Sequence, residues 1–98
     1  MTPEGRIKAK LRRALDSLGR LYVFMPVQQG LGAATLDYLI CARGRFVSIE
    51  TKAPGKKLTP RQLITKAAIE RAGGVVLVVD SDESLVRALD IIVLLGVP

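Results

Sequence analysis

Hydrophobic positions along the chain follow two different periods, which predicts a mixture of helices and strands. From Thr2-Pro3 to Gly19 the apolar residues recur every three or four positions, as on one face of a helix. Thr2 suits an N-cap, Pro3 the first helical position and Gly19 the helix end. The stripe consists of Ile7, Leu11, Ala14, Leu15 and Leu18.

Three β-prone segments follow this helix, at residues 21–27, 36–42 and 45–52. A loop with Gly30 and Gly32 separates the first two segments. Only Arg43-Gly44 lies between the second and the third, which predicts a hairpin with a tight two-residue turn.

The second half of the chain predicts a helix, a strand and a last helix. Thr59-Pro60 opens the first of these helices, which runs to about Ala72. The apolar run Val75 to Val79 is typical of a strand buried on both faces, and the last helix starts within residues 80–83. The order α-β-β-β-α-β-α predicts one α/β domain over residues 1–98, with helices packed on a mixed sheet and a helical crossover before the last strand.

Charge narrows the range of partners. The net charge is +6, but residues 1–71 carry +9 and residues 72–98 carry −3. A basic surface favours a polyanion, and nucleic acid is the natural candidate. No apolar run is long enough to cross a bilayer, so we expect no membrane partner.

The cysteine and histidine counts exclude several kinds of chemistry. Cys41 is the only cysteine, which excludes an internal disulfide and fits a reducing, cytoplasmic compartment. The chain has no histidine, which excludes Ser-His-Asp and Cys-His nucleophiles and imidazole zinc sites. Any catalysis must therefore use carboxylates and lysine, with or without a bound hard cation.

The hairpin brings two acidic residues together. With a two-residue turn at Arg43-Gly44, Asp37 lies directly opposite Glu50, with Cβ atoms about 4.5–5.5 Å apart. Like charges so placed repel, so either one carboxyl takes up a proton or a divalent cation lies between them. Lys52 lies on the same face as Glu50, where an ammonium could hold an attacking water or stabilise charge on a phosphate. Oxygen ligands favour Mg²⁺ or Mn²⁺, and the pattern indicates metal-assisted phosphodiester hydrolysis.

A surface salt-bridge cluster is the alternative, with Glu50 neutralised by Lys52 or by a nearby arginine. This alternative must also explain the second acid opposite Glu50 and the basic surroundings. A bulge in the turn would shift the register by one residue and separate the two acids.

The segment LDYLICARGRFVSIETKAPGKKLTPRQ (residues 36–62) resembles the active-site block of the PD-(D/E)XK nuclease superfamily. Asp37 matches its aspartate, and Glu50-Thr51-Lys52 matches its E-x-K motif. The glycine loop before Asp37, the L-T-P-x-Q helix opening and the GG-V strand that follows are similar to the VRR-NUC family, in its small stand-alone viral and bacterial type. The resemblance spans roughly residues 4–85. It departs at Thr35-Leu36, where relatives often have a proline before the aspartate, and at Thr51, where Leu or Val is commoner.

This resemblance implies a restriction-endonuclease-like αβββαβ core, which a C-terminal helix follows here. It implies that Asp37, Glu50 and the backbone carbonyl of Thr51 hold the metal, that Lys52 is catalytic and that Gln62 orients the site. It also implies a homodimer that acts on branched DNA such as Holliday junctions.

Two further side chains have two interpretations each. Gln62 is the fourth residue of Thr59-x-x-Gln62 and could simply complete a capping box, whereas the resemblance places it in the site. Glu4 could favour the helix dipole, but it lies three residues before Ile7 on the inward stripe, and the first-helix glutamate of the family completes the site. We therefore expect Glu4 among the catalytic and metal-binding residues.

Basic residues flank both regions. They can contact phosphates without reading bases, or they can form a solvated face. The candidates for nucleic-acid contact are Lys8, Arg12, Lys56, Lys57 and Arg61.

The last helix predicts self-association. One stripe can cover the sheet, and it consists of Leu85, Leu89, Ile92 and Val93. Ile91, Leu94 and Leu95 lie on other sides, and exposed apolar patches of this kind mark interfaces. The sequence thus predicts a homodimeric, Mg²⁺- or Mn²⁺-dependent endonuclease that selects DNA by its structure. The alternatives are a non-catalytic nucleic-acid-binding module with the same fold and a small structural α/β protein.

Overall fold

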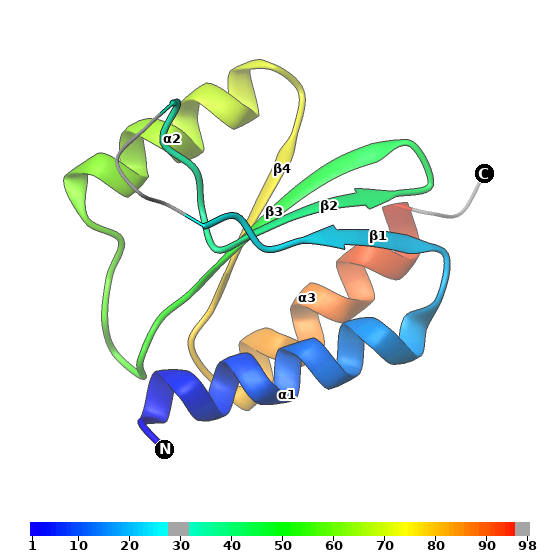
Figure 1. Cartoon of the computed structure of the whole chain (residues 1–98), viewed down its shortest axis with the longest axis vertical. Coiled ribbons are helices and arrows are strands. Elements are labelled where there is room, and N and C mark those ends of the chain that lie inside the picture. The colour runs from blue at the N-terminus through cyan, green and yellow to red at the C-terminus, as the bar shows by residue number, and fades with distance from the viewer. Residues whose placement is uncertain (28–31, 96–98) are drawn as a thin grey trace.

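Four strands form one mixed sheet with helices on both faces in the computed structural model, which describes residues 1–27 and 32–95 (Figure 1). The strands are β1 (Leu21–Phe24), β2 (Tyr38–Ala42), β3 (Arg45–Thr51) and β4 (Val75–Val79). The helices are α1 (Pro3–Leu18), α2 (Pro60–Arg71) and α3 (Asp82–Leu95). The strands lie in the order β1-β2-β3-β4, with antiparallel pairing up to β3 and parallel pairing between β3 and β4. This arrangement, with α2 as the crossover, confirms the predicted fold class.

Helix α1 begins where the sequence predicts, because Thr2 caps it. The Thr2 hydroxyl oxygen accepts a hydrogen bond from the backbone N–H of Gly5 at 3.0 Å. The apolar stripe of α1 faces the sheet and packs beside α3, so both helices cover the same face (Figure 1). The largest fully buried side chains of this core are Leu11, Leu15, Leu36, Tyr38, Ile40, Ile49 and Ile92.

The turn of the β2–β3 hairpin fixes the register of the sheet. Ala42 pairs with Arg45 across the turn, as predicted. The two turn residues have φ values of 51° at Arg43 and 85° at Gly44, and a type I′ turn requires positive φ at both positions. The hairpin therefore has no bulge at the turn, and the register continues unchanged along both strands.

The open end of the hairpin lies at the other end of these strands. The last pair in the ladder is Tyr38 with Ile49, so β2 is shorter than the segment predicted from residue 36. Asp37 lies one residue outside the ladder, opposite Glu50. Asp37 therefore keeps the register of the sheet, while its backbone N–H donates to the side chain of Glu50.

The prediction that the Val75–Val79 strand is buried on both faces is wrong. Only Val79 is fully buried, and the rest of β4 is half-buried. The strand lies at the edge of the sheet, and α2, which packs on it, buries none of its own residues. The cover over this edge is therefore thin.

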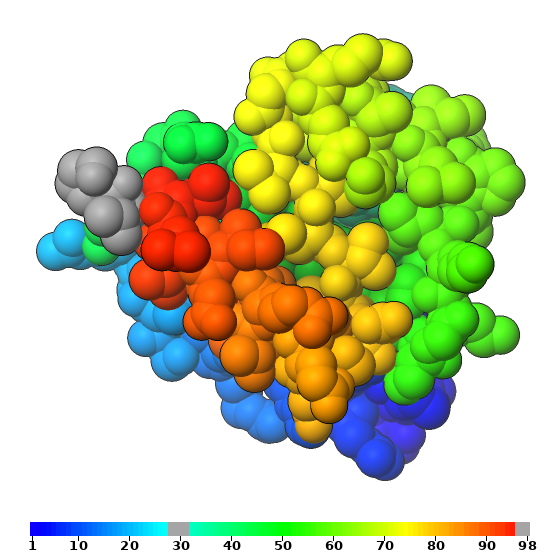
Figure 2. Space-filling model, turned by 180° about the vertical axis from the view of Figure 1, so that it is seen from behind, coloured from blue at the N-terminus to red at the C-terminus, as the bar shows by residue number. Residues whose placement is uncertain are grey.

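Helix α3 runs across the surface of the molecule opposite to the view of Figure 1, in orange to red in Figure 2. Its buried line consists of Ser84, Ala88 and Ile92, with Leu85, Leu89 and Leu95 packed beside it. Two predictions are therefore wrong, because Val93 is exposed and Leu95 packs against the core. The exposed apolar residues of α3 are Val86, Ile91, Val93 and Leu94. Among the described residues, no helix has the length and apolar character needed to cross a membrane.

Candidate active site

The two acids at the open end of the hairpin are in contact, as the register predicts. The backbone N–H of Asp37 donates to Oε1 of Glu50 at 3.1 Å. Glu50 is the next-to-last residue of β3 and is 5% exposed, whereas the Asp37 side chain is 22% exposed. The pair thus has a buried member and a member that faces the solvent.

Thr51 holds the carboxylate of Asp37 from inside the molecule. Its backbone N–H and its hydroxyl both donate to Oδ2 of Asp37, at 3.0 Å and 2.6 Å. Thr51 itself is completely buried at the end of β3. The family resemblance implies a role only for the backbone carbonyl of Thr51, so the hydroxyl contact was not predicted. The available signal was a polar residue at the end of an inward row with Val47 and Ile49.

Gln62 contacts Glu50 from the start of α2. Its Nε2 donates to Oε2 of Glu50 at 2.7 Å, while its Oε1 accepts the backbone N–H of Thr59 at 3.0 Å. The backbone N–H of Gln62 donates in turn to the Thr59 hydroxyl. The two interpretations of Gln62 therefore hold together: the side chain completes the capping box with its oxygen and contacts the acid with its nitrogen.

Lysines approach the acids from two sides. Nζ of Lys52 lies 3.9 Å from Oε2 of Glu50, and its side chain is 13% exposed. Nζ of Lys8, on α1, lies 3.8 Å from Oδ2 of Asp37 and 3.9 Å from Oε2 of Glu4. Lys8 therefore belongs to the site itself, although the sequence placed it only on a flanking basic surface. Glu4 contacts Lys8 and does not cluster with Asp37 and Glu50 among the described residues, so its role as a ligand stays a prediction.

Electrostatics oppose full ionisation of the acidic pair. Burial raises the pKa of Glu50 above its ordinary value of 4.5, and the negative charge of Asp37 raises it further. The hydrogen bond from the Asp37 amide and the charges of Lys52 and Lys8 act in the opposite direction without cancelling the shift. A proton or a cation between the two acids would relieve this strain.

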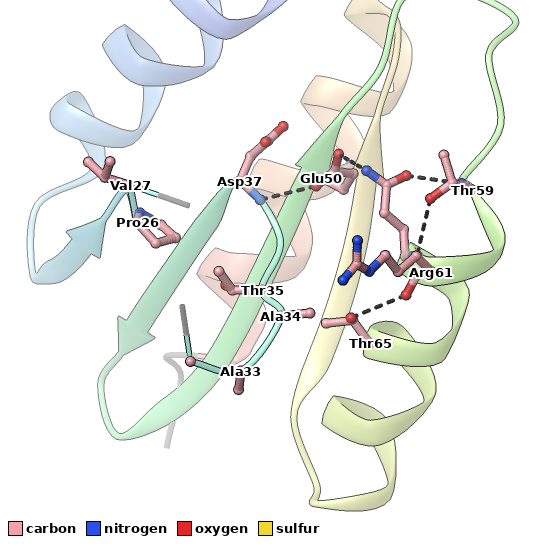
Figure 3. Close-up of a pocket in the computed structure, with 12 residues that line it drawn as sticks. Pro26, Val27, Ala33, Ala34, Thr35, Asp37, Glu50, Thr59, Arg61 and Thr65 are labelled. Carbon is pink, nitrogen blue, oxygen red and sulfur yellow. Dashed lines mark hydrogen bonds between the residues drawn. The ribbon is translucent and has the colours of Figure 1, made fainter. Parts of the chain in front are cut away.

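A cavity of about 470 Å³ opens beside the pair (Figure 3). Its wall includes Asp37 and Glu50 from the hairpin and Arg61 and Gln62 from α2. The view in Figure 3 shows Arg61 and Glu50 on adjoining parts of this wall. The wall of the cavity thus contains two acids and one guanidinium, an arrangement that can hold a cation and a phosphate together.

The other basic candidates lie in two places. Lys56 and Lys57 are exposed in the segment that joins β3 to α2, which lies between Lys52 and Gln62 along the chain. Arg12 is engaged elsewhere, with Nε 3.4 Å from Oδ1 of Asp16 and Nη1 3.1 Å from the sulfur of Met25. A phosphate contact by Arg12 would have to compete with these neighbours.

The residues present fit a hard divalent ion with few protein ligands. Within residues 1–27 and 32–95, no three side chains of His, Cys, Asp or Glu cluster closely enough to enclose a metal ion on their own. Two carboxylates are nevertheless sufficient for Mg²⁺, which keeps several waters and takes substrate phosphate as a further ligand. Because burial and Asp37 disfavour the ionised form of Glu50, a bound cation would stabilise the charged pair.

Asp37→Asn should stabilise the metal-free protein at neutral pH. The side-chain oxygen of Asn can still accept both hydrogen bonds from Thr51, but the charge that repels Glu50 is gone. We expect the free energy of unfolding in urea and EDTA to rise by about 0.2–1 kcal/mol. The gain should be complete above the raised pKa of Glu50 and should vanish as the pH falls towards 4.5, because Glu50 is then protonated in the native state. A stability difference from the wild type that is the same at pH 4.5 and at pH 7 would show that the two acids do not repel.

The fold of this chain is similar to that of a solved structure. No protein-family model and no curated protein matches the chain. A solved structure described as a "VRR_NUC domain" matches with a TM-score of 0.78 and 25% sequence identity, over 92% of this chain and 97% of that one. The chain therefore has the fold of a VRR_NUC domain, and the predicted resemblance to the VRR-NUC family is confirmed.

Proposed function

We propose that this protein is a divalent-metal-dependent endonuclease that hydrolyses phosphodiester bonds in DNA. The observation that carries the proposal is the contact between Asp37 and Glu50, with Lys52 beside it. The likeness to a VRR_NUC domain supports a nuclease-type function. A salt-bridge cluster accounts less well for the same residues, because the pKa of Glu50 remains raised despite both lysines.

The proposed roles follow from where each side chain lies. Asp37, Glu50 and the backbone carbonyl of Thr51 would hold Mg²⁺ or Mn²⁺, and Glu4, which now contacts Lys8, could complete the set. When bound, the ion supplies Lewis-acid stabilisation of the phosphate and a lowered pKa for its water. Lys52 would hold the attacking water or stabilise charge on the phosphate.

Gln62 would act on Glu50 rather than on the substrate. Its amide nitrogen holds Oε2 of Glu50, which fixes the orientation of a buried carboxylate. Such hydrogen bonds to metal ligands commonly tune both geometry and affinity. We therefore propose that Gln62 is a positioning residue.

The proposed substrate is branched DNA, such as a Holliday junction. The charge of +9 on residues 1–71 favours a polyanion, and Arg61 lies in the wall of the site cavity. Lys8 lies 3.8 Å from Asp37, and Lys56 and Lys57 are exposed in the segment between β3 and α2. These three lysines would contact phosphates rather than bases. The preference for branched DNA rests on the family resemblance and on shape selection by such contacts.

Incubation with four-way junction, flap and linear duplex DNA tests the function. We expect cleavage with Mg²⁺ or Mn²⁺ and none in EDTA, with the four-way junction cut fastest. Glu50→Gln should reduce cleavage to background while circular dichroism shows an intact fold. Wild-type protein that binds DNA but never cuts it, with either metal, would identify a non-catalytic binding module instead.

Lys52→Ala should separate binding from turnover. Because Lys52 lies beside the metal-binding oxygens rather than among them, we expect normal Mn²⁺ affinity and a loss of about 10²–10³-fold in kcat. Lys57→Ala is a matched control, since it removes an exposed lysine from the same connecting segment. It should weaken DNA binding modestly and leave kcat at saturating DNA unchanged. Equal losses of DNA affinity in both variants, with no effect on kcat, would make Lys52 a simple phosphate contact.

We also propose a homodimer that associates through α3. The exposed apolar residues Val86, Ile91, Val93 and Leu94 lie along this helix, in the less basic part of the chain where two copies repel weakly. A two-fold dimer would present two equivalent sites to one branched substrate.

Light scattering near micromolar concentration should give twice the chain mass of 10.6 kDa. Leu94→Glu should convert the dimer to a monomer, because it places a charge in the proposed interface. Tyr22→Glu is a matched control on the opposite side of the molecule, where Tyr22 of β1 is 70% exposed. A monomer that appears only with Tyr22→Glu would place the interface on the sheet face instead.

A further inference from the structure

The Thr51 hydroxyl has an unusual position among the polar groups of the core. Thr51 ends the inward row of β3 that contains Val47 and Ile49, and all three side chains are completely buried. An apolar residue would fill this position without the need for a hydrogen-bond partner. The hydroxyl instead donates to Oδ2 of Asp37 over 2.6 Å, a length typical of a strong bond to a carboxylate.

Two donors from Thr51 hold the same oxygen of Asp37. The backbone N–H, at 3.0 Å, and the hydroxyl, at 2.6 Å, both reach Oδ2. The described residues provide no hydrogen-bond donor for Oδ1 of Asp37. The carboxylate is therefore anchored by one oxygen, and its rotation about the side-chain bond is restricted.

The backbone N–H alone would not give the same restraint. Asp37 lies outside the β2–β3 ladder, so strand pairing does not hold the backbone that carries its side chain. A single hydrogen bond would let the carboxylate swing about that bond or exchange its two oxygens. The second donor, a different atom of Thr51 at a shorter distance, opposes both motions.

We propose that Thr51 is a positioning residue, whose hydroxyl fixes Asp37 so that Oδ1 is presented to the divalent ion. The inference rests on the proposed metal site and adds a residue whose side chain would not touch the ion. Removing the hydroxyl should leave the ligands in place but less well oriented. The loss should appear as weaker metal affinity, an effect that partners of metal ligands commonly have.

Three substitutions separate positioning from ordinary core packing. Thr51→Val keeps the shape and removes the hydroxyl, whereas Thr51→Ser keeps the hydroxyl and removes a methyl group. Ser48→Ala is a matched control, since Ser48 is equally buried on β3 but donates to the backbone carbonyl of Tyr38 at 3.0 Å. Loss of the Ser48 hydroxyl should lower the free energy of unfolding without changing the hydrogen bonds from Thr51 to Asp37.

Mn²⁺ binding without DNA, measured by calorimetry or by electron paramagnetic resonance of free Mn²⁺, provides the test. We expect Thr51→Val to weaken Mn²⁺ binding by about 10–100-fold, while Thr51→Ser and Ser48→Ala bind like the wild type. In cleavage assays the metal concentration for half-maximal rate should rise with Thr51→Val by a similar factor. Saturating metal should restore much of its kcat.

Different results would overturn the two proposals separately. If the wild type binds Mn²⁺ and folded Thr51→Val binds it equally well, the positioning role is wrong and the proposed function is unaffected. If the wild type neither binds Mn²⁺ nor cuts DNA, the proposed function fails, and the role of Thr51 towards a metal fails with it. If Thr51→Val does not fold, Thr51→Ala replaces it. Equal Mn²⁺ affinities of Thr51→Ala and Thr51→Ser would then overturn the positioning role.

Discussion

Two carboxylates that repel each other are held together at the open end of the hairpin, and the surrounding structure offsets that repulsion. Two residues donate hydrogen bonds to the acids, Thr51 from the end of β3 and Gln62 from α2. Two lysines add positive charge at 3.8–3.9 Å, Lys52 after β3 and Lys8 from α1. The site therefore exists only when the hairpin and both helices are docked. Hydrogen bonding and the lysine charges offset only part of the effect of burial and of the Asp37 charge, so the pKa of Glu50 stays raised.

The geometry of the acidic pair could be predicted because it depends on local rules. A two-residue turn with Gly44 allows few backbone conformations, and it sets every later pair along the two strands. The position of Asp37 opposite Glu50 follows from counting residues back from that turn. The capping box at Thr59 and Gln62 is equally local, since it involves residues only three positions apart.

The contacts of Lys8, Val93 and Thr51 could not be predicted with the same rules. Lys8 reaches Asp37 because of how α1 is rotated on the sheet, and no pattern within α1 specifies that rotation. Val93 is exposed because α1 and α3 share one face of the sheet, so the buried line of α3 depends on its neighbour. The role of the Thr51 hydroxyl was not predicted, because strands favour β-branched residues and threonine is therefore ordinary at that position. The sequence offered two signs, a polar residue at the end of an inward apolar row and the departure from the Leu or Val of relatives.

Gln62 joins the start of α2 and the acidic pair into one unit, and this restricts which residue the chain can use there. A capping box accepts glutamate as well as glutamine at this position. Here a glutamate would direct a third carboxylate at Glu50, in place of the amide nitrogen that now donates to it. Two residues that are equivalent for starting a helix are therefore not equivalent at this position. The difference between them comes from Glu50 on β3, 12 residues earlier in the chain. The residue that suits this helix start therefore depends on the tertiary fold as well as on local structure.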